Sequence, residues 1–583
     1  MNEHVNVHSA FAQYFSQDAL TPWLYQLSKA MDAGHVCLNT ANMAPMDGES
    51  EMLNPKILNG HRLVGDESAI LPFILHREKL YLHRFFHYEK RLVQRIKDLC
   101  DRPIAANIAN SLPRLSAILN QLFPTNSNTD PDWQKIACTT ALLNQFSILS
   151  GGPGTGKTTT ITKLLALLFS AQPECKVVLC APTGKAAARM EESIRQSEKM
   201  LRQCMLDESI IQQITNLKAA TIHSTLGYQA NSIHFRHNAR RPLDADVLIV
   251  DECSMIDLAL FYKLFEAIDL QRTKVILLGD KNQLASVEAG SVFRDLCTAA
   301  PAVNTFHQEQ LQRMSDMLSE EALHALPMSH EKHRLNGRII ELQKSHRFSD
   351  ERGIGKLSKA ILNNEQETLQ YYFDQTEEEE VAIFPPTALN NCINYAAKAL
   401  YRENGGYIGE EQINSALERM TNSTILCAVK EGKNGVYAVN NQIVQQVFKP
   451  SGPFFHNQLI MVSKNQPREN VYNGDMALLR ETTRGIAAYF RKGPDDYLQL
   501  NPAQILAQDT AFAMTIHKSQ GSEFNEVLII LPEKKDNLLL TKELLYTAIT
   551  RAKKKVKIVG TEEVIRQIAT QSVQRISGIA DHF

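Results

Sequence analysis

Residues Gly151 to Thr158 read GGPGTGKT and match the phosphate-binding loop pattern G-x-x-x-x-G-K-[ST]. Glycines let successive backbone N–H groups point at phosphates, and a following helix N-terminus adds a favourable dipole. Lys157 is suited to neutralise charge on the β- and γ-phosphates, and the Thr158 hydroxyl to ligate Mg²⁺. The sequence therefore predicts a site for ATP and Mg²⁺, whose loop residues are Gly152, Gly154, Thr155, Gly156, Lys157, Thr158 and Thr159.

Two acidic residues follow a second apolar run. Asp251 and Glu252 come directly after ADVLIV, residues 245–250, at the end of a strand where α/β sheets bind ligands. An Asp there can hold Mg²⁺, and a Glu can orient or deprotonate an attacking water. The alternative is that these residues cap the helix that follows, but the phosphate-binding loop upstream favours the catalytic interpretation.

Three more polar residues are candidates for reading or stabilising phosphate charge. Gln283 follows the apolar run KVILLG, residues 274–279, where its amide can report the γ-phosphate; a surface turn is the alternative. Arg347 and Arg551 lie far downstream and can stabilise charge on a transferred phosphoryl group. A planar guanidinium suits that role better than an ammonium.

Short apolar runs alternate with helical stretches along most of the chain, and this rhythm predicts parallel sheets covered by helices. We expect an α/β fold with two such domains and a small β insertion, at about 452–509, in the second. The first strand series is FSILS (146–150), KVVLCA (176–181), ADVLIV (245–250) and KVILLG (274–279), and the second is VAIF (381–384), TILCAV (424–429), EVLIIL (526–531) and KVKIV (555–559).

The N-terminal part lacks this alternation of apolar runs and helical stretches, and we expect it to be mostly helical. Residues 80–100 form an amphipathic pattern in which Phe85, Leu92 and Ile96 share one face. Two interpretations stay open: the helix packs on its own domain, or its aromatic and basic residues dock a partner or stack single-stranded bases. We expect an N-terminal docking domain over 1–115, a linker over 116–132 and two α/β domains over 133–335 and 336–583.

Composition sets limits on the class of protein. The 583 residues are 44% hydrophobic and 22% charged, which is typical of packed globular domains. The net charge of −2 gives no global basic field, so any nucleic-acid contact must be local. No apolar run approaches the roughly 20 residues needed to cross a bilayer, and the N-terminus lacks a signal-peptide pattern. We expect a cytoplasmic protein with no membrane contact.

The order of the motifs resembles that of the superfamily 1 helicases. Around the phosphate-binding loop and DECS (251–254) the chain carries WQKIA, APTGKAAARM, TIHSTLG, GDKNQLASVEAG, LQKSHRF, MTIHKSQGSEF and LLYTAITRAKK. The stretches VEAGSVFRDL, AFAMTIHKSQGSEF and YTAITRA are similar to the RecD family, the α subunits of the bacterial RecBCD enzyme, exodeoxyribonuclease V. The N-terminal stretch LPFILHREKLYLHRFFHYEKRL is also similar to that family.

The resemblance implies two RecA-like motor domains that close on ATP and reopen after hydrolysis. It implies a 5′ to 3′ DNA helicase that acts at duplex ends and on single strands during recombinational repair, together with RecB-like and RecC-like subunits. It places Gln134 at the adenine and makes Arg347 and Arg551 arginine fingers. The residues that it turns towards the DNA strand are Thr183, His223, Thr515 and His517.

Three rival interpretations stay open. A longer relative acts alone and carries helix-hairpin-helix repeats before its motor, whereas no such pattern is found before Gln134. A nuclease would need a carboxylate cluster; Pro494–Asp496 lacks the acidic-x-Lys element that would accompany it, so we expect no nuclease site. A non-motor ATP switch would not need the DNA-facing motifs.

Overall fold

The computed structural model describes residues 6–41, 53–124, 130–229, 232–375, 379–401, 405–493, 496–533 and 539–583. The chain forms two compact units. The first contains residues 1–281, 285–344 and 574–583, and the second contains residues 282–284 and 345–573. None of the helices in the described ranges is both long and apolar enough to span a membrane.

The first unit is built on a parallel sheet of six strands in the order β10-β5-β9-β8-β6-β7. Successive residues of a strand point to opposite faces, so a strand buried on both sides is apolar throughout. In β8, Leu248 and Val250 join the core on one face, and Val247 and Ile249 join the core on the other. The strands are β5 Phe146–Gly151, β6 Val177–Ala181, β7 Ala219–Thr221, β8 Val247–Val250, β9 Lys274–Gly279 and β10 Ile339–Leu342.

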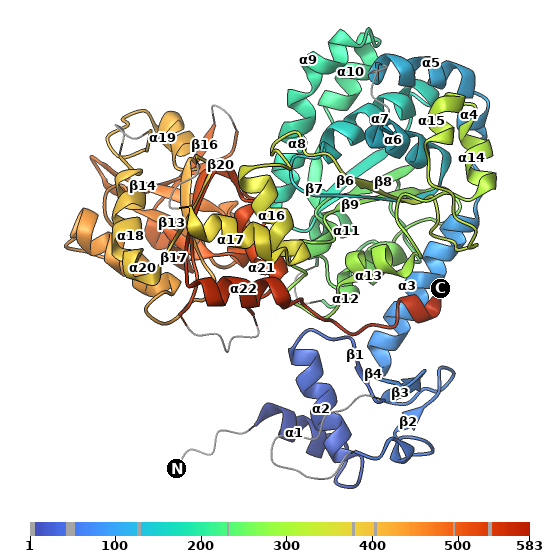
Figure 1. Cartoon of the computed structure of the whole chain (residues 1–583), viewed down its shortest axis with the longest axis horizontal. Helices are drawn as coiled ribbons and strands as arrows, with labels where there is room; N and C mark the ends of the chain where they lie inside the picture. The colour runs from blue at the N-terminus through green and yellow to red at the C-terminus, as the bar shows by residue number, and fades with distance from the viewer. Residues whose placement is uncertain are drawn as a thin grey trace. The chain divides into compact units, whose positions relative to one another are not determined.

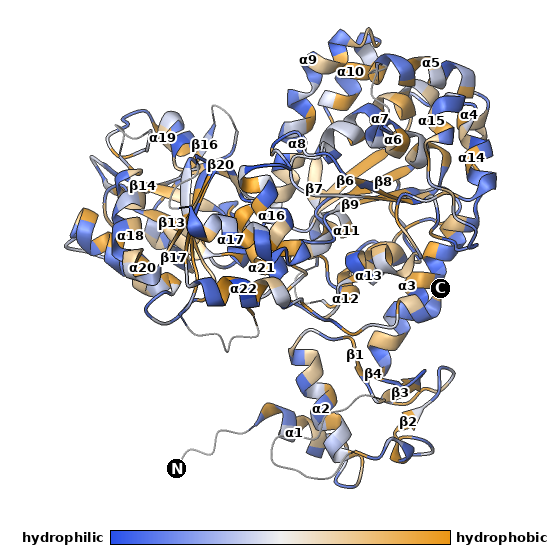
Figure 2. Ribbon diagram, viewed as in Figure 1, coloured by the Kyte–Doolittle hydropathy of each residue, from blue (hydrophilic) through white to orange (hydrophobic). Residues whose placement is uncertain are grey.

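Helices cover both faces of this sheet, as Figure 1 shows around β6, β8 and β9. Figure 2 shows the apolar colour concentrated on these strands, while the helices show both colours along their length. One face carries α5 Leu112–Leu122, α6 Trp133–Leu143, α7 Lys157–Ala171, α8 Gly184–Gln196, α9 Glu198–Gln203, α10 Glu208–Thr215 and α14 Gln308–Met314. The other carries α3 His83–Asp101, α11 Ile222–Leu226, α12 Leu258–Glu266 and α13 Val292–Ala299.

Helix α3 packs on its own unit, which settles one alternative left open by the sequence. Phe85, Phe86 and Leu92 are buried in the core that α3 shares with α12. Arg95 donates to the backbone oxygens of Phe265, at 2.7 Å, and Ile268, at 2.6 Å. These aromatic side chains therefore fill the interior of this unit and are not available to a partner or to stacked bases.

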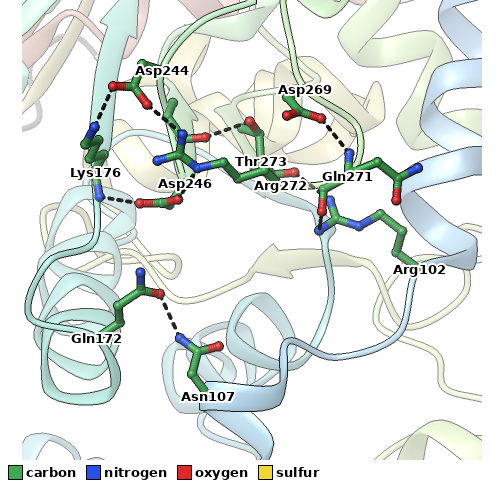
Figure 3. Close-up of polar contacts among 11 residues, drawn as sticks. Arg102, Asn107, Gln172, Lys176, Asp244, Asp246, Asp269, Gln271, Arg272 and Thr273 are labelled. Carbon is green, nitrogen blue, oxygen red and sulfur yellow. Dashed lines mark hydrogen bonds and ion pairs between the residues drawn. The ribbon is translucent and has the colours of Figure 1, made fainter.

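The end of α3 is tied to the amino ends of the sheet strands (Figure 3). Arg102 donates to the backbone oxygens of Thr273, at 3.0 Å, and Gln271, at 2.8 Å. Beside it, Arg272 pairs with Asp244 at 2.6 Å and Asp246 at 2.5 Å. These contacts lie at the edge of the sheet where β8 and β9 begin, so they leave the carboxyl edge open for a site.

The expected linker over 116–132 is partly wrong. Residues 112–122 form α5, whose Leu115 and Leu119 are buried in the core beneath α7. Apolar spacing continues through α5, so burial keeps it helical where we expected a connection. Residues 125–129 of that range lie outside the described residues.

The N-terminal segment holds a sheet as well as helices. Helices α1 Val7–Phe15 and α2 Thr21–Asp32 pack with a four-stranded sheet of order β1-β4-β3-β2 around a small core that includes Trp23. The strands are β1 Cys37–Asn39, β2 Val64–Gly65, β3 Phe73–His76 and β4 Lys79–Leu82. Strands this short give little periodic signal, which is why the sequence indicated a mostly helical segment.

The second unit is built on a parallel sheet of order β11-β20-β19-β12-β18. Its strands are β11 Val381–Phe384, β12 Ser423–Cys427, β18 Ala513–Thr515, β19 Phe524–Ile530 and β20 Ala552–Val559. Its helices are α16 Gly353–Asn363, α17 Gln366–Asp374, α18 Leu389–Lys398, α19 Ile413–Arg419, α20 Val436–Ile443, α21 Lys542–Ile549 and α22 Glu562–Thr570. The expected α/β class with two parallel-sheet domains is confirmed.

A separate antiparallel sheet, from Leu459 to Thr510, matches the range expected for the β insertion, about 452–509, to within one residue at its end. Its order is β16-β15-β14-β13-β17. Alternate residues divide between two cores: Ile460 and Val462 face a small core of this sheet, and Leu459 and Met461 face the main core of the unit. The strands are β13 Leu459–Val462, β14 Met476–Thr482, β15 Gly485–Arg491, β16 Tyr497–Leu500 and β17 Gln508–Thr510.

The boundary expected between 335 and 336 is displaced. Strand β10 pairs in parallel with β5, with Ile340 opposite Leu149, so it belongs to the first sheet. The chain enters the second unit only at Ser345, and residues 574–583 return to the first unit. Pairing with a strand nearly 200 positions earlier, Ile339 with Ile148, leaves no local sequence signal.

We predict that Leu92→Ala destabilises the first unit by about 2–5 kcal/mol, because Leu92 is fully buried and its removal leaves a cavity. Both tryptophans, Trp23 and Trp133, lie in the first unit, so urea unfolding followed by tryptophan fluorescence reports on it. Ile70→Ala, at a side chain that is 93% exposed, is the control and should leave the transition unchanged. Equal shifts for the two variants would contradict the packing of α3.

Candidate active site

The phosphate-binding loop joins β5 to α7 with the backbone turns that its glycines allow. Gly154 and Gly156 have φ of +78° and +86°, in the left-handed region that glycine adopts without strain. A Cβ on Gly156 would lie 2.3 Å from Nε2 of Gln134. Gln134 therefore lies directly against the loop, and only glycine fits between them.

Hydrogen bonds inside the loop hold its polar side chains in place. Lys157 Nζ donates to the backbone oxygens of Gly151, at 2.6 Å, and Gly152, at 3.2 Å. Gln134 Nε2 donates to the oxygen of Thr155 at 3.0 Å. The structure thus brings Gln134 and Lys157 to the same loop, while Thr158 and Thr159 lie in the first turn of α7.

Asp251 and Glu252 follow β8 at the same edge of the sheet. Burial raises the pKa of Asp251 to about 6, and the neighbouring Glu252 adds to the rise, while Lys157 and Arg189 oppose it. Glu252 has φ of +51°, a conformation that costs a non-glycine residue about 1–3 kcal/mol and clusters at functional sites. A half-buried carboxyl group with a raised pKa, beside a second carboxylate and near a lysine, is suited to receive a divalent cation.

Gln283 and Arg551 are brought together inside the second unit. Arg551 Nη2 donates to Gln283 Oε1 at 2.8 Å, and both residues are buried. The same guanidinium donates to the backbone oxygens of Ser522, at 3.1 Å, and Thr547, at 3.3 Å. Two residues that the sequence predicted separately as phosphate-facing are therefore direct hydrogen-bond partners.

Arg347 makes a different contact in the second unit. Its Nη2 donates to Oε1 of Glu523 at 2.7 Å, and Lys553 approaches the other oxygen of that carboxylate at 3.3 Å. Nη1 of Arg347 is buried and has no hydrogen-bond partner within the described part of the chain. This half of the guanidinium is suited to accept an anionic ligand.

Thr183 and His223 follow the carboxyl ends of neighbouring strands in the first unit. Strands β6 and β7 are parallel, with Ala181 opposite Thr221. Thr183 caps α8, where its hydroxyl accepts from the N–H of Ala186 at 3.2 Å. His223 is exposed and its ring lies edge-on to Phe235, with ring centroids 5.7 Å apart. Both residues therefore lie on the sheet edge that carries the phosphate-binding loop.

Thr515 and His517 lie at the carboxyl end of β18 in the second unit. Thr515 Oγ1 accepts from the N–H of Lys518 at 3.3 Å, and His517 begins the short turn that follows. Thr515 and Lys518 line a surface pocket of about 280 Å³, together with Tyr437, which is 54% exposed. Lys518 lies in the quoted stretch MTIHKSQGSEF but was not given a role there, and Tyr437 lies outside every pattern with a recognisable chemical role.

Of the segment Pro494–Asp496, which we considered for a nuclease carboxylate, Pro494 and Asp495 lie outside the described residues. Among the described residues, no group of three or more His, Cys, Asp and Glu side chains is placed to hold a metal ion.

The chain is similar in sequence to known proteins over most of its length. Residues 134–289 match a family model described as an AAA domain, and residues 510–559 match one described as a UvrD-like helicase C-terminal domain. The chain is 33% identical over 544 residues to the RecBCD enzyme subunit RecD of Haemophilus influenzae, an alignment that covers 88% of this chain and 81% of that protein.

The chain is also similar, more distantly, to a second helicase sequence and to a solved structure. The ATP-dependent RecD2 DNA helicase of Deinococcus radiodurans is 26% identical over 479 residues, which cover 82% of this chain and 54% of that protein. The crystal structure of a Pif1 helicase from Bacteroides, in complex with ADP-AlF3 and ssDNA, is 16% identical. That match covers 75% of this chain and 94% of the other, with a TM-score of 0.38.

We predict that Asp251→Asn stabilises the first unit above pH 6 and has little effect at low pH. Because the folded pKa of about 6 exceeds the ordinary 3.8, the folded state holds a proton that the unfolded state releases, and wild-type stability falls as pH rises between these values. Asparagine does not titrate. Urea midpoints of both proteins at about pH 4.5 and about pH 8 measure the difference; a gain that does not change with pH would contradict the raised pKa of this carboxyl group.

Proposed function

Because the chain belongs to the RecD family, we propose that it is an ATP-dependent DNA helicase that moves 5′ to 3′ as a subunit of a RecBCD-type complex. The complex would open DNA ends for recombinational repair, with RecB-like and RecC-like subunits as partners. One observation carries the proposal: the carboxyl edge of the first sheet holds the phosphate-binding loop and Asp251 next to Thr183 and His223. ATP hydrolysis and contact with the DNA strand would then take place at the same edge of this sheet.

In the proposed mechanism, the first unit binds and positions ATP. The backbone N–H groups of the loop and Lys157 hold the phosphates, and Gln134, fixed against Thr155, lies beside the adenine. Glu252, whose backbone N–H donates to the Asp251 carboxylate at 2.8 Å, orients the attacking water and accepts its proton. Mg²⁺ held by Thr158 and Asp251 would draw negative charge from the phosphate oxygens.

The second unit would respond to the γ-phosphate through its arginines. Arg347 has an Nη1 without a hydrogen-bond partner in the described residues, which supports a role as a donor to phosphate oxygens. Arg551 would have to exchange its bond to Gln283 for one to phosphate. Because one partner is lost as the other is gained, this exchange couples the presence of the γ-phosphate to the conformation of Gln283.

Strand contact would rest on phosphates and stacking, not on base edges, since a motor must move over any sequence. Thr183, His223, Thr515 and His517 are the proposed contacts. A stand-alone helicase is less well supported, because the chain is 26% identical to the RecD2 helicase of Deinococcus radiodurans but 33% identical to the RecBCD enzyme subunit RecD of Haemophilus influenzae. We place no nuclease activity in this chain.

We predict that Lys157→Gln abolishes ATP hydrolysis, with and without single-stranded DNA, while the chain stays folded. The lysine donates to two loop carbonyls, so its loss removes charge from the phosphates and not packing from a core. ATPase rate and DNA binding are measured on the chain alone and with its candidate partner subunits. Lys199→Gln, at an exposed lysine, is the control; a folded Lys157→Gln protein with full turnover would rule out this ATP site.

We predict that Arg551→Ala lowers the rate of hydrolysis far more than nucleotide affinity, because a finger acts on charge that develops in the transition state. Such arginines contribute roughly 10³ to 10⁵ in rate. Single-turnover hydrolysis and nucleotide titration are compared for Arg551→Ala, Arg551→Lys and the control Arg491→Ala, an exposed arginine of the same unit. If affinity and rate fall equally, Arg551 has only a structural role.

A further inference from the structure

The last ten residues of the chain are held along the first unit at several points. The N–H of Ile576 donates to Nδ1 of His35 at 2.9 Å, and the oxygen of Ile576 accepts from the N–H of Val36 at 2.9 Å. The N–H of Gly578 donates to the buried carboxylate of Glu89 at 3.0 Å. Figure 1 shows the C-terminus ending beside α3. We call residues 574–583 the C-terminal strap.

Arg575 of the strap binds one loop by three of its backbone carbonyls. Nη1 donates to the oxygens of Glu288, at 2.7 Å, and Gly290, at 2.8 Å, and Nη2 donates to the oxygen of Ser286 at 2.5 Å. Nη1 also lies 3.3 Å from the Ser286 hydroxyl. One planar guanidinium thus fixes the course of the backbone from Ser286 to Gly290.

The space around this guanidinium is closed on its other side. A Cβ on Gly34 would lie 2.8 Å from Cζ of Arg575, and Gly34 has φ of +86°. The oxygen of Gly34 accepts from the N–H of Gly290 at 3.0 Å. The arginine is therefore enclosed between the loop and the N-terminal segment, with its direction fixed.

The loop and the strap both begin where the chain passes between units. Residues 282–284 belong to the second unit and residue 285 returns to the first, while the strap begins where the chain leaves the second unit after Val573. Within the second unit, the N–H of Leu284 donates to Thr547 at 3.0 Å and Gln283 accepts from Arg551. Arg575 therefore holds together two segments of the first unit, residues 286–290 and the strap, and each of them begins within two residues of a point where the chain passes between the units.

We propose that Arg575 is a positioning residue that couples ATP hydrolysis to movement along DNA. It holds residues 286–290 against the strap. A displacement of Gln283 is then transmitted through these residues to the first unit, whereas a flexible loop would change its own conformation and transmit nothing. The inference rests on the proposed function, since it needs a motor with a phosphate-sensing Gln283. It adds a residue outside every motif that the sequence analysis singled out.

Arginine is the residue type that this task requires. Its fork presents several N–H groups in one plane and in fixed directions, whereas the ammonium of lysine is a compact group on a flexible stem. Lysine can bond one or two of the three carbonyls but cannot hold all three in one plane. We therefore expect Arg575→Lys to retain part of the coupling and Arg575→Gln to retain little.

The test measures ATP molecules consumed per nucleotide travelled, using the full chain alone and in complex with its partner subunits on single-stranded DNA tracks. For Arg575→Gln we expect at least a severalfold rise in this ratio, with the KM for ATP within about twofold of wild type, and for Arg575→Lys an intermediate rise. Urea unfolding by tryptophan fluorescence shows whether the first unit remains folded. Arg77→Gln is the matched control, because Arg77 donates to the oxygen of Asp581 in the same strap but does not contact the loop.

The outcomes separate the inference from the function it rests on. Wild-type protein whose ATPase ignores single-stranded DNA contradicts the proposed function itself. A functional wild type with an unchanged ratio in Arg575→Gln overturns the inference, as does an equal rise in Arg77→Gln, which would make strap attachment alone responsible. If Arg575→Gln does not fold, Arg575→Lys decides: an unchanged ratio overturns the inference and a raised ratio supports it.

Discussion

Burial of both faces of the six-stranded sheet is the constraint on which the other features of the first unit depend. Strands such as β8 are apolar on each side, so helices must cover both faces and only the two edges remain for polar chemistry. Arg102 and the ion pairs of Arg272 occupy the amino edge. The carboxyl edge is left for the loop of Lys157, for Asp251 and for the proposed strand contacts.

The residues at the carboxyl edge lower the stability of the folded first unit. Burial raises the pKa of Asp251 to about 6 beside a second carboxylate, and Glu252 occupies a left-handed backbone conformation. Both features are unfavourable until a ligand supplies positive charge and contacts, so the surrounding core has to maintain them. The apolar packing of α3 against α12 is part of that core, which makes the helix before the motor motifs a structural part of the motor.

The second unit has the opposite character, because its arginines already have internal partners. Arg551 bonds Gln283 and two backbone carbonyls, and Arg347 bonds Glu523. Placing a guanidinium group away from water without such partners would destabilise the folded chain. The contacts therefore stabilise these charges while no phosphate is bound. If phosphate contacts replace these bonds when ATP is bound, the ATP-bound and ATP-free states of the helicase differ in the hydrogen bonds of their arginines. Conversion of hydrolysis into movement requires such a difference between the two states.

The sequence by itself determined the loop around Lys157, the acidic pair, the eight strand segments and the α/β class, because each depends on residues close together in the chain. It misplaced the boundary at 335, extended the linker into α5 and left open whether α3 packs on its own domain or docks a partner. Only the tertiary structure decided that β10 joins β5, that Gln283 meets Arg551, and that Arg575 holds the loop after Gln283. These pairs are separated by roughly 190 to 290 positions in the sequence. Contacts between residues so far apart in the chain depend on how helices and strands pack against each other, and no local sequence pattern records that packing.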